Sequence, residues 1–346
     1  MPEALQYGVF PNLGADLSRV ERALLLEVED RPDLTEIVQH LFDGIPKLVR
    51  PTLALMAAYA CSDPICPVSK RVIDAATAIE LTHVGTMCHD DVMDEADMRR
   101  GRASVRARWG NVMAILNGDF LLASASEIAA ELGAKEARIL GTTFRRLCTG
   151  QMIETRDLYN PLRTVESYLA AIAGKTATLL GSACRIGVLE AGGDEEAAER
   201  AAGFGEHFGI AFQINDDLLD LTASSETLGK AAGKDVLEGV YTLPVLLARE
   251  ECPELRTLLD PPMASERIPL IRELVCNSGA LMRSAGIAEG HMREAEATLD
   301  NHTIPADSAE ALLDFARGIV RELDRYGRNV DVRAWPEREP RRSRQQ

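Results

Sequence analysis

Two short acidic clusters of nearly the same pattern lie within long segments that are otherwise rich in apolar residues. They read Asp90-Asp91-Val92-Met93-Asp94 and Asp216-Asp217-Leu218-Leu219-Asp220. Because residues four apart share one face of an α-helix, each cluster would place a row of carboxylates along a helix. Buried carboxylates need partners, and Mg²⁺ prefers oxygen ligands from one or two carboxylates together with substrate phosphates. The two clusters therefore predict a helical protein that binds Mg²⁺ and a diphosphate.

The remainder of the chain is also helical in pattern. Ala, Leu and Glu are abundant, aromatic residues make up 5% of the chain, and no sustained alternation of period two is visible. Long helices are expected over about residues 69–94 and 111–132, the second of them closed by Gly133. A third is expected over about residues 194–221, with Asp194 as its N-cap. The pattern predicts an all-α fold.

The chain is expected to form one domain with a short tail. No segment has the composition of a linker, so residues 1–326 are predicted to fold together. Residues 327–346 carry arginines among Pro and Glu and are predicted to be a disordered tail. A weak contact of this tail with a membrane surface is the alternative.

The composition narrows the classes of function and location. The formal net charge of −16 argues against a nucleic-acid partner, since nucleic-acid binding depends on basic surface. The seven cysteines are scattered without the paired spacing of a zinc site, which favours reduced thiols. The sequence shows no secretory signal pattern and no apolar run approaching the ~20 residues of a membrane span. A cytoplasmic protein is therefore expected.

Polar residues suited to a diphosphate accompany the acidic clusters. His83 shares a helix face with Asp90, and Gln213 precedes the second cluster on the face of Asp216. Hydroxyl and cationic groups, which bind phosphate oxygens, occur at Lys47, Arg50, Arg99, Arg100, Lys175, Thr176 and Lys230. Taken singly, each is more often a solvated group than a ligand. Their combination favours a phosphate site.

The order of these motifs resembles that of the trans-isoprenyl diphosphate synthases, also called polyprenyl synthetases. The resemblance extends over about residues 17–324 and is specific because many motifs occur in the same order. Besides the acidic clusters, it rests on Lys47-Leu48-Val49-Arg50-Pro51, Glu80-Leu81-Thr82-His83, Gly118-Asp119-Phe120-Leu121, Gly174-Lys175-Thr176, Phe212-Gln213, Gly229-Lys230, Glu238-Gly239 and Thr242-Leu243-Pro244.

The resemblance implies a single-domain bundle of mostly antiparallel helices around a central cavity, usually in a homodimer. It implies three Mg²⁺ ions, two held by Asp90 and Asp94 and the third by Asp216. The catalytic set would be completed by Asp91, Asp217, Asp220 and Lys175. The allylic diphosphate would be bound by Lys175, Thr176, Gln213, Lys230 and Arg99. Isopentenyl diphosphate would be bound by Lys47, Arg50, His83 and Arg100.

The implied reaction is a head-to-tail condensation. Mg²⁺ and cationic side chains would neutralise the charge that develops on the departing diphosphate. The alkene of isopentenyl diphosphate would attack the resulting allylic cation, and the released pyrophosphate would accept the proton. Three departures from the usual pattern of the family, Ile45-Pro46, Leu48 and Val240, remove no metal ligand but bear on diphosphate binding.

Product length is expected to depend on the helix face below the first cluster, because bulk there limits chain growth in the family. Gly85 and Thr86, one turn before Asp90, are both small. We therefore expect a long product of about six to ten isoprene units, on helical spacing alone. Geranylgeranyl diphosphate is the nearer alternative.

Two other classes of protein remain to be weighed. A class I terpene cyclase also has an aspartate-rich motif on an all-α fold, but Lys47, Arg50 and His83 would then have no explanation. A non-catalytic subunit of a heteromeric synthase would tend to lose aspartates, whereas this chain has all six. Both readings are less favoured than an active synthase.

Overall fold

The computed structural model describes residues 9–27, 32–42, 48–99, 101–222, 233–299 and 304–327, without the side chains of 32–34 and 322–327. Several sequence predictions fall outside this part of the chain. They concern Lys47, Arg100 and Lys230, the Ile45-Pro46 departure, and residues 328–346 of the predicted tail.

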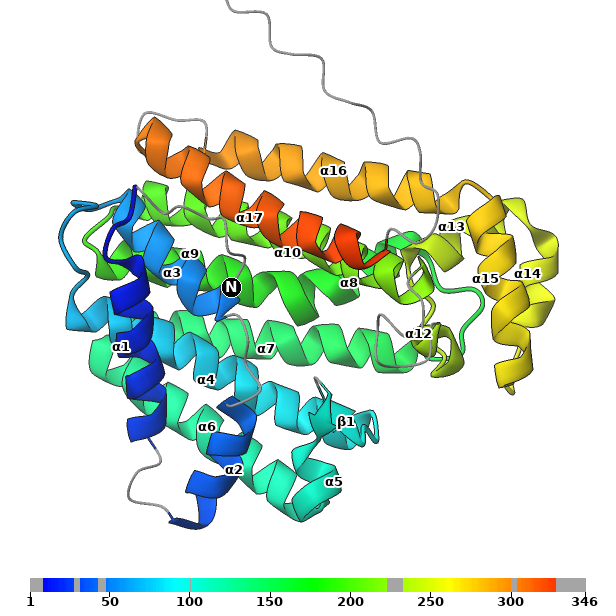
Figure 1. The fold of residues 1–346 in the computed structure, drawn as a ribbon, viewed down its shortest axis with the longest axis horizontal. Helices are drawn as coiled ribbons and strands as arrows, with labels where there is room; N and C mark the ends of the chain where they lie inside the picture. Colours follow the sequence, from blue (N-terminus) through cyan, green and yellow to red (C-terminus); the bar gives the residue numbers. More distant parts are fainter. Residues whose placement is uncertain are drawn as a thin grey trace, which may run out of the picture.

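The described residues form a helical bundle in which several long helices follow the long axis of the molecule (Figure 1). The prediction of an all-α fold is confirmed. The main helices of the N-terminal half are α1 (Leu13–Leu26), α2 (Pro32–Phe42), α3 (Val49–Ala60), α4 (Lys70–Met93), α5 (Val105–Trp109), α6 (Asn111–Leu132) and α7 (Ala134–Arg156). Those that follow are α8 (Val165–Ile172), α9 (Thr178–Glu190), α10 (Glu195–Thr222), α12 (Lys234–Leu237), α13 (Leu243–Glu251), α14 (Pro253–Leu258), α15 (Ile268–Asn277), α16 (Ala280–Leu299) and α17 (Ala306–Gly327).

The three long helices predicted from the sequence agree with α4, α6 and α10 to within a residue or two. Ser69 caps α4, since its side chain accepts a hydrogen bond from the backbone N–H of Val72. The carboxylate of Asp194 caps α10 in the same way by accepting from Ala197 N at 2.8 Å. Gly133, with φ of 152°, lies between α6 and α7 and lets the chain turn between them. Asp194 and Gly133 therefore lie at the helix boundaries for which the sequence predicted them, and Ser69 is a further cap.

Three short elements were not predicted. A two-stranded antiparallel hairpin, β1 (Met98–Arg99) with β2 (Arg102–Ala103), follows α4 directly. A π-helical turn, η1 (Ala173–Ala177), joins α8 to α9 and contains the Gly174-Lys175-Thr176 motif. A 3₁₀ turn, η2 (Ser265–Arg267), precedes α15. Single π turns within helices are frequent at functional sites, so η1 is a candidate part of the functional site.

Glycines allow helices to approach closely at two points that position the motifs. A Cβ added at Gly118 of α6 would lie 2.4 Å from His89 Nε2 of α4. A Cβ added at Gly150 of α7 would lie 2.5 Å from the backbone nitrogen of Lys175 in η1. Both distances are shorter than any real contact, so a side chain at either position would push the elements apart. These glycines thus allow α6 to pack closely on α4, and α7 to pack closely on η1.

The core consists of two apolar clusters. The larger one joins α1, α3, α4, α6, α9 and α10, and the smaller one joins α8 and α10 to α13–α16. Among the described residues, α6 alone is long and apolar enough to cross a membrane, but one of its faces is buried in the larger cluster. Core helices of soluble proteins share that composition, so a single such helix is weak evidence of a membrane span.

Candidate active site

The first aspartate motif occupies the C-terminal end of α4. Asp90 is half-buried, Asp91 is fully buried, and Asp94 is exposed at the C-cap of the helix. Arg99, from strand β1, donates to Asp91 Oδ1 through both Nε and Nη2, at 2.7 and 2.6 Å. The hairpin, which was not predicted, thus brings the guanidinium of Arg99 back to the buried carboxylate of Asp91. Asp90 and Asp94 are left as the more accessible pair.

The second aspartate motif, near the end of α10, repeats this arrangement. Asp216 is exposed, whereas Asp217 and Asp220 are buried. Asp217 accepts from Gln213 Nε2 at 2.9 Å and from Tyr168 Oη at 2.5 Å, one donor on each oxygen. Burial is the main cause that raises the pKa of Asp217, to about 7. The side chain of Asp220 accepts from the backbone N–H of Asp235 at 3.3 Å.

The π-helical turn η1 connects the two motifs. Thr176 Oγ1 donates to Gln213 Oε1 at 2.8 Å, which ties η1 to the second motif. Lys175 Nζ donates to Glu154 Oε1 of α7 at 2.7 Å. Burial opposes the charge of Lys175, but Glu154, Asp90 and Asp94 outweigh it and raise the pKa of the ammonium group. The Lys175 ammonium group therefore lies within the electrostatic field of the first motif, while the next residue, Thr176, is hydrogen-bonded to Gln213 beside the second motif.

The electrostatics of Asp90 reflect the same neighbourhood. Burial is the largest influence and raises the pKa of Asp90, while the positive charge of Lys175 opposes it and Asp94 adds to it. Glu154 raises the pKa of both Asp90 and Asp217 through its charge. Carboxylates of α4, α7 and α10 thus act on one another electrostatically, in a neighbourhood where Lys175, Arg99 and Lys234 supply positive charge. Such a surplus of negative charge favours the binding of cations.

The donor set fits Mg²⁺ bound jointly with a diphosphate. Within the described ranges, no three carboxylate, imidazole or thiolate groups converge to form a preformed metal site. This is the arrangement expected for Mg²⁺, which retains several waters and takes only one or two carboxylates together with phosphate oxygens. The accessible carboxylates Asp90, Asp94 and Asp216 would hold the ions. When bound, Mg²⁺ would neutralise charge on the leaving diphosphate.

The environment of Arg99 and Asp91 differs in part from the sequence expectation. We expected Arg99 to bind the allylic diphosphate and Asp91 to belong to the catalytic set. The structure pairs these two residues, so Arg99 offers a diphosphate only the edge of its guanidinium that is not occupied by Asp91. Asp91 is shielded from solvent, and it orients Arg99 more directly than it could hold an ion.

The predicted residues for isopentenyl diphosphate are placed only in part. Arg50 lies in the first turn of α3 and His83 in α4, both half-buried. These helices pack against each other, so the two residues come from neighbouring elements. Lys47, Arg100 and Lys230 lie outside the described residues, and their roles stay predictions.

Two residues of the site were missed by the sequence reasoning. Glu154 binds Lys175, and Tyr168 binds Asp217. A signal for Glu154 was present, since it follows the buried residues Leu147 and Gly150 on the inner face of α7. Tyr168 lies seven residues before Lys175 on an apolar face, which gives no hint of a carboxylate partner.

The predicted chain-length residues border a cavity without lining it. The cavity has a volume of about 240 Å³ and lies between α4, α6 and α7, lined by Thr82, Leu122, Ala123, Ser126, Ala137, Leu140, Gly141 and Phe144. Gly85 faces α6, because a Cβ there would lie 3.0 Å from both Gly118 O and Leu122 Cγ. Thr86 donates its hydroxyl to His83 O at 2.9 Å. Thr82, one turn earlier on α4, is the residue of this helix that reaches the cavity.

The fold and the paired aspartate motifs define a class of protein. The profile of the polyprenyl synthetase family matches residues 31–268, and the chain belongs to this family. It is 41% identical to the nonaprenyl diphosphate synthase of Mycobacterium tuberculosis over 72% of this chain and 75% of that protein. It is 34% identical to heptaprenyl diphosphate synthase component 2 of Geobacillus stearothermophilus, over 91% and 95% of the two chains.

A solved structure of similar architecture contains a bound metal and ligand. It is the polyprenyl synthase from Caulobacter crescentus CB15 complexed with calcium and isoprenyl diphosphate. The TM-score is 0.83, the sequence identity is 31%, and the match covers 90% of this chain and 96% of the other. The predicted family is thus confirmed by sequence and by fold.

Proposed function

We propose that this protein is a trans-polyprenyl diphosphate synthase, which condenses isopentenyl diphosphate head-to-tail with an allylic diphosphate. The observation that carries the proposal is the η1 turn, where Lys175 lies in the field of the first aspartate motif and Thr176 binds Gln213 beside the second. One diphosphate at this point would meet ligands from both motifs. The family relatives named above are prenyl diphosphate synthases, which supports the same reaction.

The roles of the side chains follow from their surroundings. Asp90, Asp94 and Asp216 are the carboxylates accessible to Mg²⁺, and the family resemblance implies three ions. Lys175, with a raised pKa, stays protonated and binds the diphosphate of the allylic substrate as this group leaves the allylic carbon. Exclusion of water from the bound prenyl group would prevent capture of the allylic cation.

The product is proposed to be a long chain of about six to ten isoprene units, in line with small residues along the α4 face. The cavity lined by Thr82 favours a long product, because it lies about two turns of α4 before Asp90, between α4, α6 and α7, where a growing tail would need space. Its lining is mostly apolar, as a prenyl tail requires. Geranylgeranyl diphosphate remains the alternative product.

A homodimer formed through α6 is proposed as the working assembly. Val112 and Leu116 on this helix are 69% and 55% exposed, and Ile115 is 42% exposed. An exposed apolar stripe of this kind indicates an interaction surface. Ala123, Ser126 and Gly141 line the cavity and are exposed, so a second copy packed on α6 would also close the cavity from outside.

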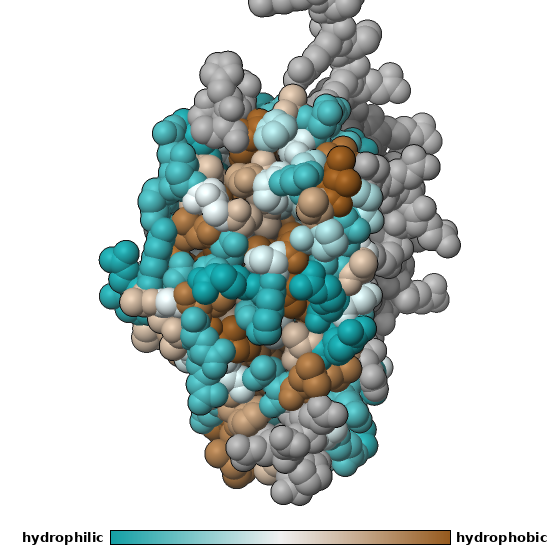
Figure 2. All heavy atoms as spheres, turned by 90° about the vertical axis from the view of Figure 1, so that its left-hand side faces the viewer, coloured by the Kyte–Doolittle hydropathy of each residue, from teal (hydrophilic) through white to brown (hydrophobic). Residues whose placement is uncertain are grey.

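The cytoplasmic location and a weak membrane contact stay proposals. Figure 2 shows hydrophilic and hydrophobic residues interspersed over the end of the molecule that carries α1. That face provides no support for a membrane-binding surface. The proposed contact therefore depends on the arginines of residues 327–346, all of which lie outside the described residues.

Product analysis tests the proposed reaction against its competitors. The purified chain is incubated with Mg²⁺ and an allylic diphosphate, with and without isopentenyl diphosphate, and the products are measured by mass spectrometry. A synthase forms longer prenyl diphosphates only when isopentenyl diphosphate is present. A terpene cyclase would instead release a hydrocarbon or alcohol from the allylic diphosphate alone, and a non-catalytic subunit would form nothing.

A further inference from the structure

A continuous chain of hydrogen bonds leads from the buried hydroxyl of Tyr168 to the site. The hydroxyl of Tyr168, in the first turn of α8, donates to Asp217 Oδ2 at 2.5 Å, and the ring is 1% exposed. The other oxygen of Asp217 accepts from Gln213, and Gln213 accepts from Thr176. Both oxygens of Asp217 are therefore bound by the protein, and the carboxylate serves to hold Gln213 in place.

Tyr168 is itself held from the opposite side by a buried arginine. The guanidinium carbon of Arg163 lies 5.5 Å from the centroid of the Tyr168 ring, and the Arg163 side chain is 1% exposed. Its Nη1 donates to Tyr241 O at 3.1 Å, and its Nε lies 3.7 Å from Asp157 Oδ2. A cation over an aromatic face fixes the plane of the ring.

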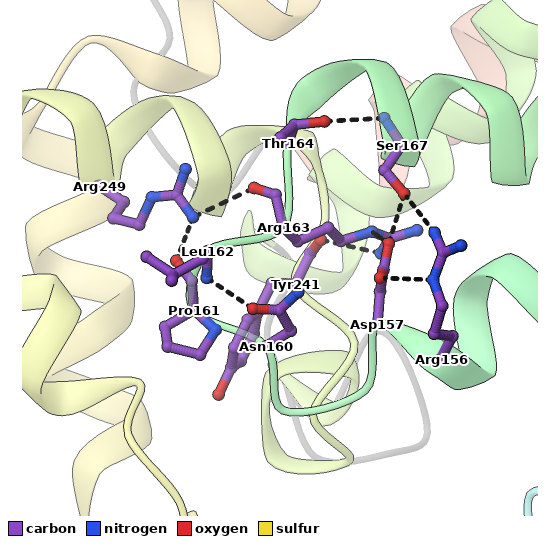
Figure 3. A network of polar contacts seen from close by, with 10 residues as sticks. All are labelled: Arg156, Asp157, Asn160, Pro161, Leu162, Arg163, Thr164, Ser167, Tyr241 and Arg249. Atoms are coloured by element: carbon purple, nitrogen blue, oxygen red, sulfur yellow. Dashed lines mark hydrogen bonds and ion pairs between the residues drawn. The ribbon is translucent and has the colours of Figure 1, made fainter.

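The loop that carries Arg163 is fixed by further polar contacts, shown in Figure 3. Arg249 donates to the carbonyls of Pro161 and Arg163. Asp157 accepts from Ser167, and the side chain of Asn160 accepts from the backbone N–H of Leu162. The loop between α7 and α8 is thus held in place by several hydrogen bonds beside Tyr168, which contacts the second aspartate motif.

We propose that Tyr168 is a positioning residue that sets the affinity of the second aspartate motif for Mg²⁺ without touching the metal or the substrate. Its hydroxyl fixes Asp217, and Asp217 fixes Gln213 and the helical turn that presents Asp216. This inference rests on the proposed function of the site. Residues that hydrogen-bond to a metal-binding group without touching the metal typically lower metal affinity by about 10- to 100-fold when they are removed.

Tyr168→Phe is the direct test, because it removes only the hydroxyl. The readout is the Mg²⁺ concentration at half-saturation for binding of an unreactive allylic thiolodiphosphate, measured by calorimetry rather than by turnover. We expect this concentration to rise about tenfold. A change of less than about twofold would overturn the proposal.

Tyr59→Phe is the matched control. The hydroxyl of Tyr59 also donates to a buried carboxylate, Asp16, but this pair joins α3 to α1 away from the motif. Both variants should therefore lose a similar amount of stability, seen as a lower melting temperature. Only Tyr168→Phe should change the Mg²⁺ dependence, and an equal change in both variants would reduce Tyr168 to a structural role.

A double variant tests whether Tyr168 acts through Asp217. In protein already carrying Asp217→Asn, the further change Tyr168→Phe should shift the half-saturating Mg²⁺ concentration by less than about twofold, since interacting residues are not additive. A further tenfold rise of the half-saturating Mg²⁺ concentration in the double variant would contradict the idea that Tyr168 acts through Asp217. If Tyr168→Phe does not fold, Arg163→Lys removes the planar group over the ring and should raise the half-saturating concentration severalfold, and no change would again overturn the proposal.

The wild-type measurement separates this inference from the proposed function. If the wild-type protein and Tyr59→Phe bind the thiolodiphosphate without any dependence on Mg²⁺, the proposed function itself fails. If wild-type binding depends on Mg²⁺ and Tyr168→Phe behaves identically, only the positioning role fails.

Discussion

Within each aspartate motif, the protein satisfies one carboxylate and leaves its neighbour accessible. Asp91 is bound by Arg99, and Asp217 is bound by Tyr168 and Gln213. Their neighbours Asp90 and Asp216 are less buried. A buried carboxylate with hydrogen-bond donors stabilises the helix end, whereas an accessible one can be reached by an ion from solvent. This division supports the accessible aspartates as the metal ligands.

Asp90→Asn tests this division at the residue scale. Removing the charge should lower kcat by about 10²- to 10³-fold, the range seen when one group that stabilises transition-state charge is lost. Asp74→Asn is the control on the same helix, because Asp74 pairs with Lys70 at 2.7 Å and lies far from the motif. Steady-state kinetics that show equal losses in both variants would contradict the assignment.

The sequence predicted which residues belong to the site better than it predicted what each one binds. Helical spacing was enough to place Asp90 and Asp94 together, and α4 confirms their helix. The partners of Asp91 and Asp217 were not predictable, because Arg99 returns through a hairpin and Tyr168 comes from another helix. Tertiary contacts of this kind leave no periodic signal in the chain.

At the scale of elements, glycines and a π turn determine how the motifs meet. Gly150 and Gly174 allow α7 and η1 to touch, and this contact brings Glu154 to Lys175. The sequence predicted the long helices from their periodicity and caps, but it gave no sign of the π turn. A π turn adds one residue to a helical ring and follows from packing rather than from local propensity.

The cavity between α4, α6 and α7 leads to a prediction about product length. Gly141 lines it from α7, and a Cβ there meets no atom within 4 Å, so a larger side chain can enter without strain. Gly141→Phe should therefore shorten the longest product, as measured by mass spectrometry. Thr82→Phe fills the cavity from α4 and should act in the same direction.

Gly286→Phe is the control for these variants, because Gly286 is also a helical glycine with open space around its Cβ but lies on α16. Thr86→Phe, the variant suggested by the sequence, is retained as a further test. Gly85→Phe is less informative, since it would displace α6. An unchanged product distribution in Gly141→Phe, Thr82→Phe and Thr86→Phe would exclude this cavity as the path of the prenyl tail.

The packing of α10 against α16 brings His207 of α10 against His291 of α16. The Nδ1 atoms of His207 and His291 lie 3.0 Å apart, so one ring donates to the other. Burial first, and then His207, lowers the pKa of His291 below its usual value of 6.5, while Glu294 opposes this shift. At this residue the unfolded chain then binds more protons than the folded protein, so the contribution of His291 to stability falls as the pH drops below about 6.5.

Chemical denaturation at several pH values checks this prediction. The contribution of His291 should lower the free energy of unfolding between pH 7 and pH 5, whereas Asp217, whose pKa is raised to about 7, acts in the opposite direction. The difference in free energy of unfolding between wild type and His291→Gln should therefore decrease from pH 7 to pH 5. Equal slopes for wild type and variant over this range would show that the histidine pair does not contribute.

At the scale of the whole molecule, the exposed stripe on α6 predicts an assembly. Ile115→Glu combined with Leu116→Glu places two charges on the stripe and should convert a dimer into monomers, because charges are disfavoured in the core of an interface. Sedimentation velocity measures the change. Ile65→Glu is the control, since Ile65 is 72% exposed in the connection before α4. A wild-type monomer, or a dimer unaffected by the double variant, would contradict the proposal.

The central claim is that divalent ions join the two aspartate motifs to one diphosphate. The most direct measurement is a crystal structure with Mn²⁺ in place of Mg²⁺ and an unreactive allylic diphosphate analogue, with the metals located by anomalous scattering. We predict Mn²⁺ bound to Asp90 and Asp94 and to Asp216, with all ions in contact with the same diphosphate. Metal found elsewhere, or a diphosphate that meets only one motif, would contradict the account.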